Sequence, residues 1–156
     1  MVDKYSKTVI ATYNSNSPEQ TEQIAADFVR SILPSGGSEP TLVLLHGEMG
    51  AGKTAFVRGM CSVIAPNAQP SSPTYSLINE YTALPNYKNL VHCDLYRISS
   101  EDDYDSIGLD EYFGNAIVAI EWPSRAAELS KMKHYSVTIN VTSETEREVK
   151  IENFSN

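Results

Sequence analysis

The composition of the chain is that of a single globular domain. Of its 156 residues, 41% are hydrophobic and 21% are charged, and a chain of this length buries a core without disulfides or structural metals. No apolar run approaches the roughly 18 residues of a membrane span, and residues 1–4 are too polar for a secretion signal. We therefore expect one cytoplasmic domain covering residues 1–156. Its two cysteines, Cys61 and Cys93, lack metal-ligand spacing; we expect reduced core residues, with a disulfide left open.

The charge balance disfavours unaided binding to nucleic acid. The chain carries 12 Lys and Arg against 20 Asp and Glu, a formal net charge of −8, whereas a protein that holds nucleic acid by itself is usually basic. Residues 101–111 contain six acidic residues and no basic one. We expect this segment to be a solvated helix and loop; the alternative is a docking surface for a basic partner.

The first two elements are predicted to be a strand and a helix. Residues 8–13 alternate weakly between apolar and polar side chains, as in a strand. Ser17 is then a helix N-cap, Pro18 suits the first helical position, and Gln20 completes a Ser-x-x-Gln capping box. The apolar face of this helix recurs at helical spacing and consists of Ile24, Ala25, Phe28, Val29 and Ile32.

A phosphate-binding loop follows. Residues 47–54 match G-x-x-x-x-G-K-[ST] at every fixed position, between an apolar run at 41–46, typical of a buried parallel strand, and an amphipathic stretch at 55–64. The loop glycines let successive N–H groups point at an anion beside the positive end of a helix dipole. Lys53 is expected to reach the β- and γ-phosphates, and the Thr54 hydroxyl to hold Mg²⁺. The predicted nucleotide-binding residues here are Glu48, Met49, Gly50, Ala51, Gly52, Lys53 and Thr54.

The remaining elements complete an α/β pattern. After the loop's helix come a turn-rich connection at 66–73, a strand at 75–84 with a turn at Pro85-Asn86, and a strand at 90–93. A short acidic helix, capped by Ser99 or Ser100, ends at Gly108, and it is followed by an apolar strand at 116–120 and a helix at 123–129. The last elements are half-buried alternating strands at 135–141 and 148–152 around a turn at 143–146. We predict a P-loop NTPase-like fold: a mixed, mainly parallel sheet flanked by helices, with a C-terminal antiparallel hairpin.

Two of these strands end in a carboxylate, Asp94 and Glu121. Ligands of open α/β sheets bind beyond the carboxyl ends of the strands, and in nucleotide hydrolases such an acid holds the Mg²⁺ shell or orients the attacking water. The alternative is that each acid caps the following helix. Spacing does not decide which acid has which role. We expect His92 to be a packed strand histidine, for which the sequence names no partner, and Trp122 to be either a core residue or a lid or partner contact.

The absence of motifs typical of GTPases and small-molecule kinases narrows the class of nucleotide-binding protein. The chain has no Asn/Thr-Lys-x-Asp guanine motif, and its one Asp-x-x-Gly match, at 105–108, falls in the acidic helix, which favours ATP over GTP. A small-molecule kinase should have an arginine-rich lid over the phosphates. Between Glu121 and the hairpin, however, the only basic residues are Arg125, Lys131 and Lys133. A kinase stays an alternative, as does a nucleotide-gated binding module in which hydrolysis is incidental.

Several motifs together resemble the TsaE (YjeE) family, the bacterial ATPase subunit of tRNA threonylcarbamoyladenosine biosynthesis. Besides the loop with Arg58-Gly59, they are Ser72-Pro-Thr-Tyr-Ser-Leu77 with Glu80-Tyr81, His92-Cys-Asp-Leu-Tyr-Arg97, Gly108-Leu-Asp-Glu-Tyr-Phe113 and Glu121-Trp-Pro123. They run in family order over residues 17–130. Met49 and Ala55 replace the usual leucine and threonine, and the C-terminal hairpin carries no family signature.

The resemblance implies ATP and Mg²⁺ as cofactors. It implies that Lys53, Asp94 and Glu121 are catalytic, that Thr54 and Glu121 join the Mg²⁺ shell, and that Thr21 lies near the nucleotide. It further implies a nucleotide-sensing switch, to which we assign Ser72, Thr74, Tyr75 and Trp122.

The resemblance also implies partners. The family does not itself transfer the threonylcarbamoyl group but works with two sugar-kinase-like subunits, of the TsaB and TsaD type, that modify the adenosine next to the anticodon. The chain would then meet tRNA only indirectly and no membrane. Arg97 and Arg125 lie near strand ends, but no motif fixes either at the phosphates, so we expect slow hydrolysis alone and stimulation by the partners.

Overall fold

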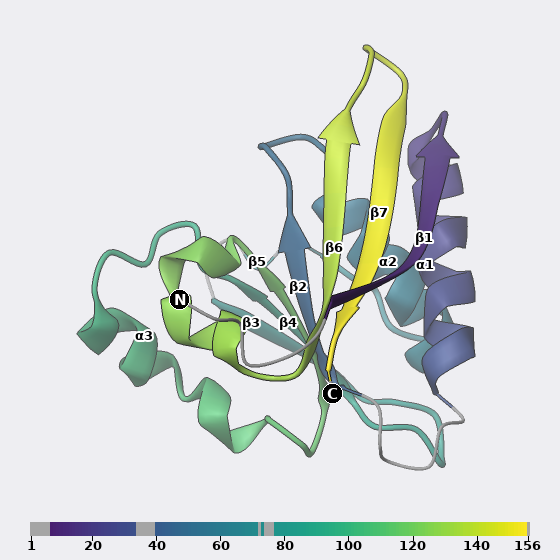
Figure 1. Ribbon diagram of the computed structural model, residues 1–156. Helices are drawn as coiled ribbons and strands as arrows, with labels where there is room; N and C mark the ends of the chain where they lie inside the picture. The colour runs from purple at the N-terminus through teal and green to yellow at the C-terminus, as the bar shows by residue number, and fades with distance from the viewer. Residues whose placement is uncertain (1–6, 34–39, 72, 74–76, 156) are drawn as a thin grey trace.

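A single seven-stranded sheet organises the chain (Figure 1). In the computed structural model, which describes residues 7–33, 40–71, 73 and 77–155, the strand order is β1-β7-β6-β2-β5-β4-β3. The strands are β1 Lys7–Ser15, β2 Leu42–His46, β3 Ile78–Tyr81, β4 Leu90–Asp94, β5 Ile117–Glu121, β6 His134–Val141 and β7 Arg147–Phe154. The pairings in the centre, from β4 through β5 and β2 to β6, are parallel, and those toward both edges are antiparallel. The predicted mixed sheet is confirmed.

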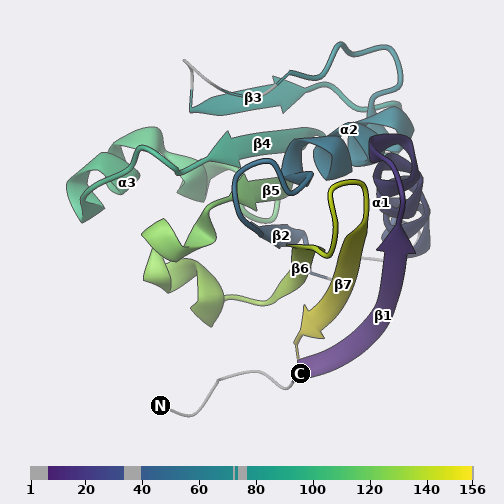
Figure 2. The same cartoon turned by 90° about the horizontal axis from the view of Figure 1, so that it is seen from above.

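Helices cover both faces of the sheet (Figure 2). α1 (Pro18–Ile32) and α2 (Lys53–Ile64) lie on one face, and α3 (Glu101–Ile107) with short 3₁₀ helices lies on the other. Double coverage explains why β5 is buried along its whole length and why both β2 and β5 consist almost entirely of apolar residues. Because β2, β4 and β5 run parallel, the phosphate loop, Asp94 and Glu121, which come at the ends of these strands, all lie at the carboxyl edge of the sheet.

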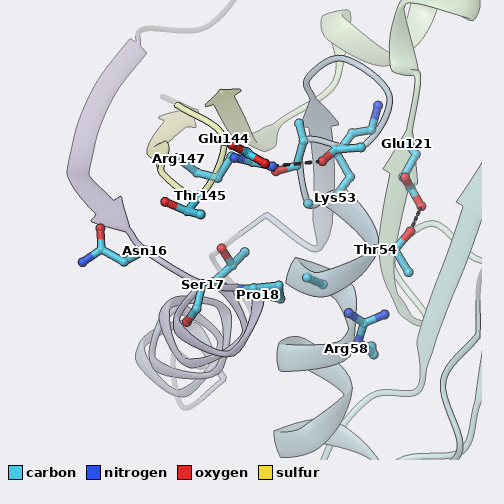
Figure 3. A pocket seen from close by; sticks show the side chains of 15 residues that line it. Asn16, Ser17, Pro18, Lys53, Thr54, Arg58, Glu121, Glu144, Thr145 and Arg147 are labelled. Carbon is cyan, nitrogen blue, oxygen red and sulfur yellow. Dashed lines mark hydrogen bonds between the residues drawn. The ribbon is translucent and has the colours of Figure 1, made fainter. Parts of the chain in front are cut away.

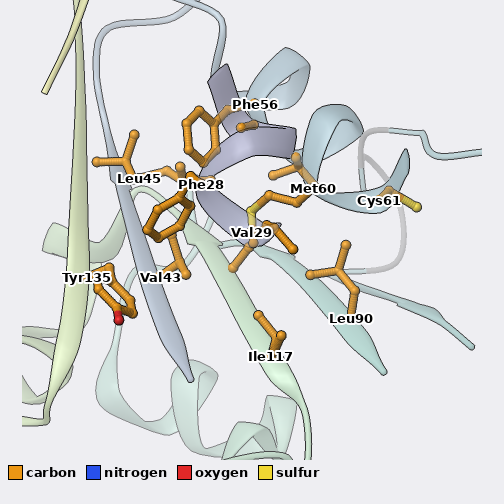
Figure 4. Packing of buried hydrophobic residues seen from close by; sticks show 14 of the residues in the cluster. Phe28, Val29, Val43, Leu45, Phe56, Met60, Cys61, Leu90, Ile117 and Tyr135 are labelled. Atoms are coloured by element: carbon orange, nitrogen blue, oxygen red, sulfur yellow. The ribbon is translucent and has the colours of Figure 1, made fainter. Parts of the chain in front are cut away.

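The core between the sheet and α1–α2 is built around aromatic side chains (Figure 4). Phe28 of α1 packs against Phe56 of α2, with ring centroids 6.0 Å apart, and edge-on against Tyr135 of β6 at 5.1 Å. These contacts fix both helices on the strands that lead to the functional edge. Burial of such rings is a major stabilising contribution.

The two helices approach each other closely at Gly59. A Cβ at this position would lie 2.1 Å from the carbonyl oxygen of Glu22, so only glycine lets α2 pass α1 at this distance. Next to the crossing, the Arg58 Nε donates to the Glu22 carboxylate at 2.8 Å. This crossing holds the start of α1 beside the start of α2, where the phosphate loop ends.

The predicted helix N-caps are confirmed, and the capping box of α1 differs from the prediction in one partner. The Ser17 hydroxyl accepts from the Gln20 backbone N–H at 3.0 Å, whereas the Gln20 side chain accepts at 2.7 Å from the N–H of Asn16, the residue before the N-cap. The acidic helix α3 uses Ser100 as its N-cap and ends at Gly108, which has a left-handed φ of 78°. Cysteines 61 and 93 are buried and free, which excludes the disulfide that the sequence left open.

At its C-terminal end the strand predicted at 75–84 is shorter than expected. β3 is an edge strand that pairs with β4, and it spans Ile78–Tyr81. Beyond it the chain turns away, and the Ala83 N–H donates to the Asn89 side chain at 2.8 Å instead of continuing the ladder. Residues 74–76 lie outside the described part of the chain.

The helix predicted at 123–129 is wrong. Two 3₁₀ helices occupy this region, Pro123–Arg125 and Ala127–Lys131. Trp122 adopts a left-handed φ of 58° before the first, and Ala126 is extended, with φ −136° and ψ 91°, between the two. These two backbone conformations interrupt the regular α-helical geometry that the apolar spacing suggested.

The C-terminal hairpin is confirmed, but its setting differs from the prediction. β6 pairs with β2 on its other side, so its first half is buried on both faces, including His134 and Ser136. β1 closes this side of the sheet by pairing with β7 along almost its full length. The predicted alternation holds only from Val137 to Asn140, and Val141, which belongs to its apolar side, is exposed.

Candidate functional site

The phosphate loop connects β2 to α2 and depends on its glycines. A Cβ at Gly47 would lie 2.8 Å from the Ile139 carbonyl oxygen, and Gly52 has a left-handed φ of 116° immediately before the first residue of α2. Side chains at these positions would clash or strain the backbone. The loop thus places the unpaired N–H groups of the first turn of α2 at its mouth, as the sequence motif predicts.

A cavity of about 440 Å³ opens beside this loop (Figure 3). Four parts of the chain line it: the loop with the first turns of α2, Glu121 at the end of β5, the start of α1, and the turn between β6 and β7. From the last two come Ser17, Pro18, Thr21, Glu144, Thr145 and Arg147. Its volume lies within the range of small-molecule and cofactor sites.

Lys53 is held at the mouth of the loop. Its side chain is buried, its Nζ donates to the Gly47 carbonyl oxygen at 2.5 Å, and it lies 3.9 Å from the centroid of the Trp122 ring. Burial lowers the pKa of Lys53, while the nearby carboxylates Glu121 and Asp94 oppose that shift. The result is a cation kept close to the loop by a carbonyl, an aromatic face and two acids.

Thr54 and Glu121 meet at the same edge. The Thr54 hydroxyl donates to Oε2 of Glu121 at 3.4 Å (Figure 3), and Glu121 is itself buried. Both groups are hard oxygen donors of the kind that Mg²⁺ prefers. In the described residues, no group of three or more His, Cys, Asp or Glu side chains is placed to hold a metal by itself. The donor set fits Mg²⁺ that is shared with substrate phosphates.

His92 is a packed strand histidine, as predicted, and the structure supplies the partner that the sequence could not name. Its Nε2 lies 2.6 Å from Oε2 of Glu121, and both side chains are buried. The contact arises because β4 and β5 are adjacent and parallel, with His92 paired to Ala119, two residues before Glu121 on the same face. Sequence alone does not provide this register.

Asp94 lies beside Glu121, its Cα partner in the β4–β5 ladder. The backbone N–H of Tyr96 donates to its carboxylate at 2.9 Å. Burial raises the pKa of Asp94 and the neighbouring Glu121 adds to the rise, whereas the Tyr96 hydrogen bond, His92 and Lys53 oppose it. A partly buried acid with a raised pKa, next to a second acid, is typical of a functional site.

The helix-capping alternative for the two acids is wrong. The N-cap of α3 is Ser100, six residues after Asp94, and the 3₁₀ helix after Glu121 has Trp122 at its N-cap position without a side-chain capping bond. Neither acid is needed to begin a helix.

Replacing Asp94 by asparagine should stabilise the fold at neutral pH. Because its pKa is raised in the folded state, the ionised side chain destabilises that state, and the wild type loses stability as pH rises from the ordinary carboxyl range through the raised pKa. We expect the Asp94→Asn melting temperature to exceed that of the wild type by roughly 1–3 °C at pH 7, a modest gain because the group is partly exposed. The difference should vanish at acidic pH. Thermal melts from pH 3 to 8 test this, with exposed Asp110→Asn as control; a variant less stable at pH 7 would contradict it.

The cavity brings together most of the predicted binding residues. Its lining includes Gly50, Ala51, Gly52, Lys53, Thr54, Thr21 and Glu121. Glu48 and Met49 belong to the loop but not to the lining, and the Met49 side chain is 68% exposed. Of the predicted switch, Ser72, Thr74 and Tyr75 lie outside the described residues, while Trp122 contacts Lys53.

The arginines at the cavity differ from those that the sequence suggested. Arg97 is exposed and Arg125 lies over the Tyr96 ring at 5.8 Å; neither lines the cavity. Arg58 and Arg147 do. The Arg147 Nε donates to the Ala51 carbonyl oxygen at 3.0 Å and so ties the β6–β7 turn to the loop across 96 residues of chain. No local motif signals such a distant contact.

Comparison with known proteins identifies the family. A family model described as "Threonylcarbamoyl adenosine biosynthesis protein TsaE" matches residues 15–149. The chain belongs to the TsaE family. Relatives described as "tRNA threonylcarbamoyladenosine biosynthesis protein TsaE" include that of Bacillus subtilis, 34% identical over 137 residues that cover 85% of this chain and 79% of the relative. That of Rickettsia typhi is 31% identical over 142 residues, covering 89% and 94%.

A solved structure shares the fold of this TsaE-family chain. The crystal structure of Bacillus subtilis YdiB matches 99% of this chain and 90% of its own, with a TM-score of 0.71 and 24% identity. The resemblance first carried by sequence motifs is thus confirmed for the family and for the fold. Among the helices of the described segments, none combines the length and apolarity needed to cross a bilayer.

Proposed function

We propose that this TsaE-family chain binds ATP with Mg²⁺ and hydrolyses it in support of threonylcarbamoylation of the adenosine next to the anticodon in tRNA. The observation that carries the proposal is the convergence of Lys53, Thr54 and Glu121 on one cavity beside a glycine loop. Membership of the TsaE family supports the role in tRNA modification, and the residues that line the cavity support the binding and hydrolysis of ATP.

The residues of the site fit distinct roles in phosphoryl transfer. The N–H groups at the start of α2 and the Lys53 ammonium group bind the β- and γ-phosphates. Thr54 and Glu121 would hold Mg²⁺, which would neutralise charge on the phosphate oxygens. Asp94, beside Glu121 at the end of β4, orients the attacking water or the switch.

The rest of the cavity suits the nucleoside. Beyond the loop it is bounded by the start of α1 on one side and by the β6–β7 turn on the other (Figure 3). Thr21 is buried there and shares a 2.7 Å hydrogen bond with Ser15. The base and ribose would therefore lie between the start of α1 and the β6–β7 turn, both outside the phosphate loop.

The site also supports a need for partners. Arg58 faces the cavity but is paired with Glu22, Arg147 is engaged with loop carbonyls, and neither Arg97 nor Arg125 lines the cavity. Loss of a transition-state arginine slows phosphoryl transfer by on the order of a thousandfold. We propose that the two sugar-kinase-like subunits, of the TsaB and TsaD type, complete the site and contact the tRNA, and that the assembly works in the cytoplasm.

Turnover with and without the partners tests this proposal. The isolated chain should bind ATP but release phosphate slowly, and adding both subunits should raise the rate by about tenfold or more. The matched control is each subunit added singly. Equal rates for the isolated and assembled protein would show that the site is self-sufficient, and absence of turnover in both would favour a nucleotide-gated binding module.

A further inference from the structure

His92 is an ionisable side chain placed inside an apolar strand. Its neighbours in β4, Leu90, Val91 and Cys93, are fully buried hydrophobic residues, and His92 itself is only 1% exposed. Burying an imidazole away from water is costly unless its polar atoms find partners. A valine or leucine would fill the same strand position without that cost, so the histidine calls for a reason beyond packing.

The partner of His92 is the carboxylate that faces the phosphate loop. Nε2 of His92 lies 2.6 Å from Oε2 of Glu121, and the Thr54 hydroxyl donates to that same oxygen at 3.4 Å. The terminal torsion of a glutamate is broad and holds no single orientation by itself. The contacts of the Glu121 carboxylate with His92 of β4 and with Thr54 of α2 restrict this torsion.

We infer that His92 is a positioning residue, which fixes the Glu121 carboxylate in the orientation that meets Thr54 and thereby prepares the pair to bind a divalent cation. The inference rests on the proposed function, since it takes Glu121 as a cation ligand. It assigns His92 no contact with nucleotide or metal. Outer-shell partners of metal-binding carboxylates typically change metal affinity by about 10–100-fold when they are removed.

A pair of substitutions separates positioning from packing. His92→Leu fills a similar volume without a donor, whereas His92→Gln retains an N–H donor near the position of Nε2. His92→Val serves as a second donor-free variant, suited to a strand, should the leucine variant not fold. In each we would measure Mn²⁺ binding in the presence of ADP by electron paramagnetic resonance, ADP affinity without metal by calorimetry, and the melting temperature.

We expect His92→Leu to weaken Mn²⁺ binding by about tenfold or more, with metal-free ADP affinity unchanged, and His92→Gln to recover most of the loss. Glu121→Ala is the reference variant. Wild-type Mn²⁺ affinity in Glu121→Ala would overturn both the proposed metal site and the role of His92. A loss in Glu121→Ala with none in His92→Leu or His92→Val would overturn only the positioning role. Equal losses in His92→Leu and His92→Gln, matched by equal drops in melting temperature, would reduce His92 to a packing residue.

Discussion

Replacing Lys53 by alanine should weaken ATP binding, turnover or both by about a hundredfold or more while leaving the fold intact. The ammonium group is held at the loop, between the Gly47 carbonyl and the Trp122 ring. Its removal deletes charge-assisted hydrogen bonds to the phosphates. The fold should tolerate the change because burial already disfavours the charged form of Lys53, as its lowered pKa indicates.

Calorimetric ATP titration and phosphate-release assays measure this effect, with melting temperature as the check on folding. Lys88→Ala is a suitable control, because Lys88 precedes β4 at the opposite edge of the sheet and its Nζ contacts only the Gly114 carbonyl among the bonds described. Wild-type affinity and turnover in Lys53→Ala would refute the assignment of the site.

The second large effect should separate the two carboxylates. Glu121→Ala is expected to raise the Mg²⁺ concentration that gives half-maximal turnover by about tenfold or more, because it removes the acid that meets Thr54. Asp94→Ala should instead lower turnover more than nucleotide affinity, because Asp94 does not line the cavity. Mg²⁺ titrations of turnover, run beside ADP binding, distinguish the two. Reversed behaviour would exchange the assigned roles.

Features encoded by neighbouring residues could be predicted from the sequence. The phosphate loop needs only its glycines, a preceding apolar strand and a following helix, and all are present at residues 42–64. The caps at Ser17 and Ser100 are likewise local. The carboxylates Asp94 and Glu121 were placed at the functional edge because parallel strands end at the same side of a sheet.

Features that depend on register or on distant contacts could not be predicted. The His92–Glu121 hydrogen bond requires the alignment of two strands, and the bond between Arg147 and Ala51 requires the hairpin to fold back over the loop. The left-handed conformation of Trp122 interrupts the expected helix, and the Trp122 ring contacts Lys53 and Tyr96, which come from distant parts of the chain. The switch at residues 72–75 stays a prediction.

Titration of ATP into the purified chain, with and without Mg²⁺, tests the central claim most directly. The account predicts one site per chain, tighter binding when Mg²⁺ is present, and loss of that Mg²⁺ dependence in Thr54→Ala and Glu121→Ala, whose side chains meet at the loop. No binding of ATP, or binding that is indifferent to Lys53, Thr54 and Glu121 alike, would contradict it.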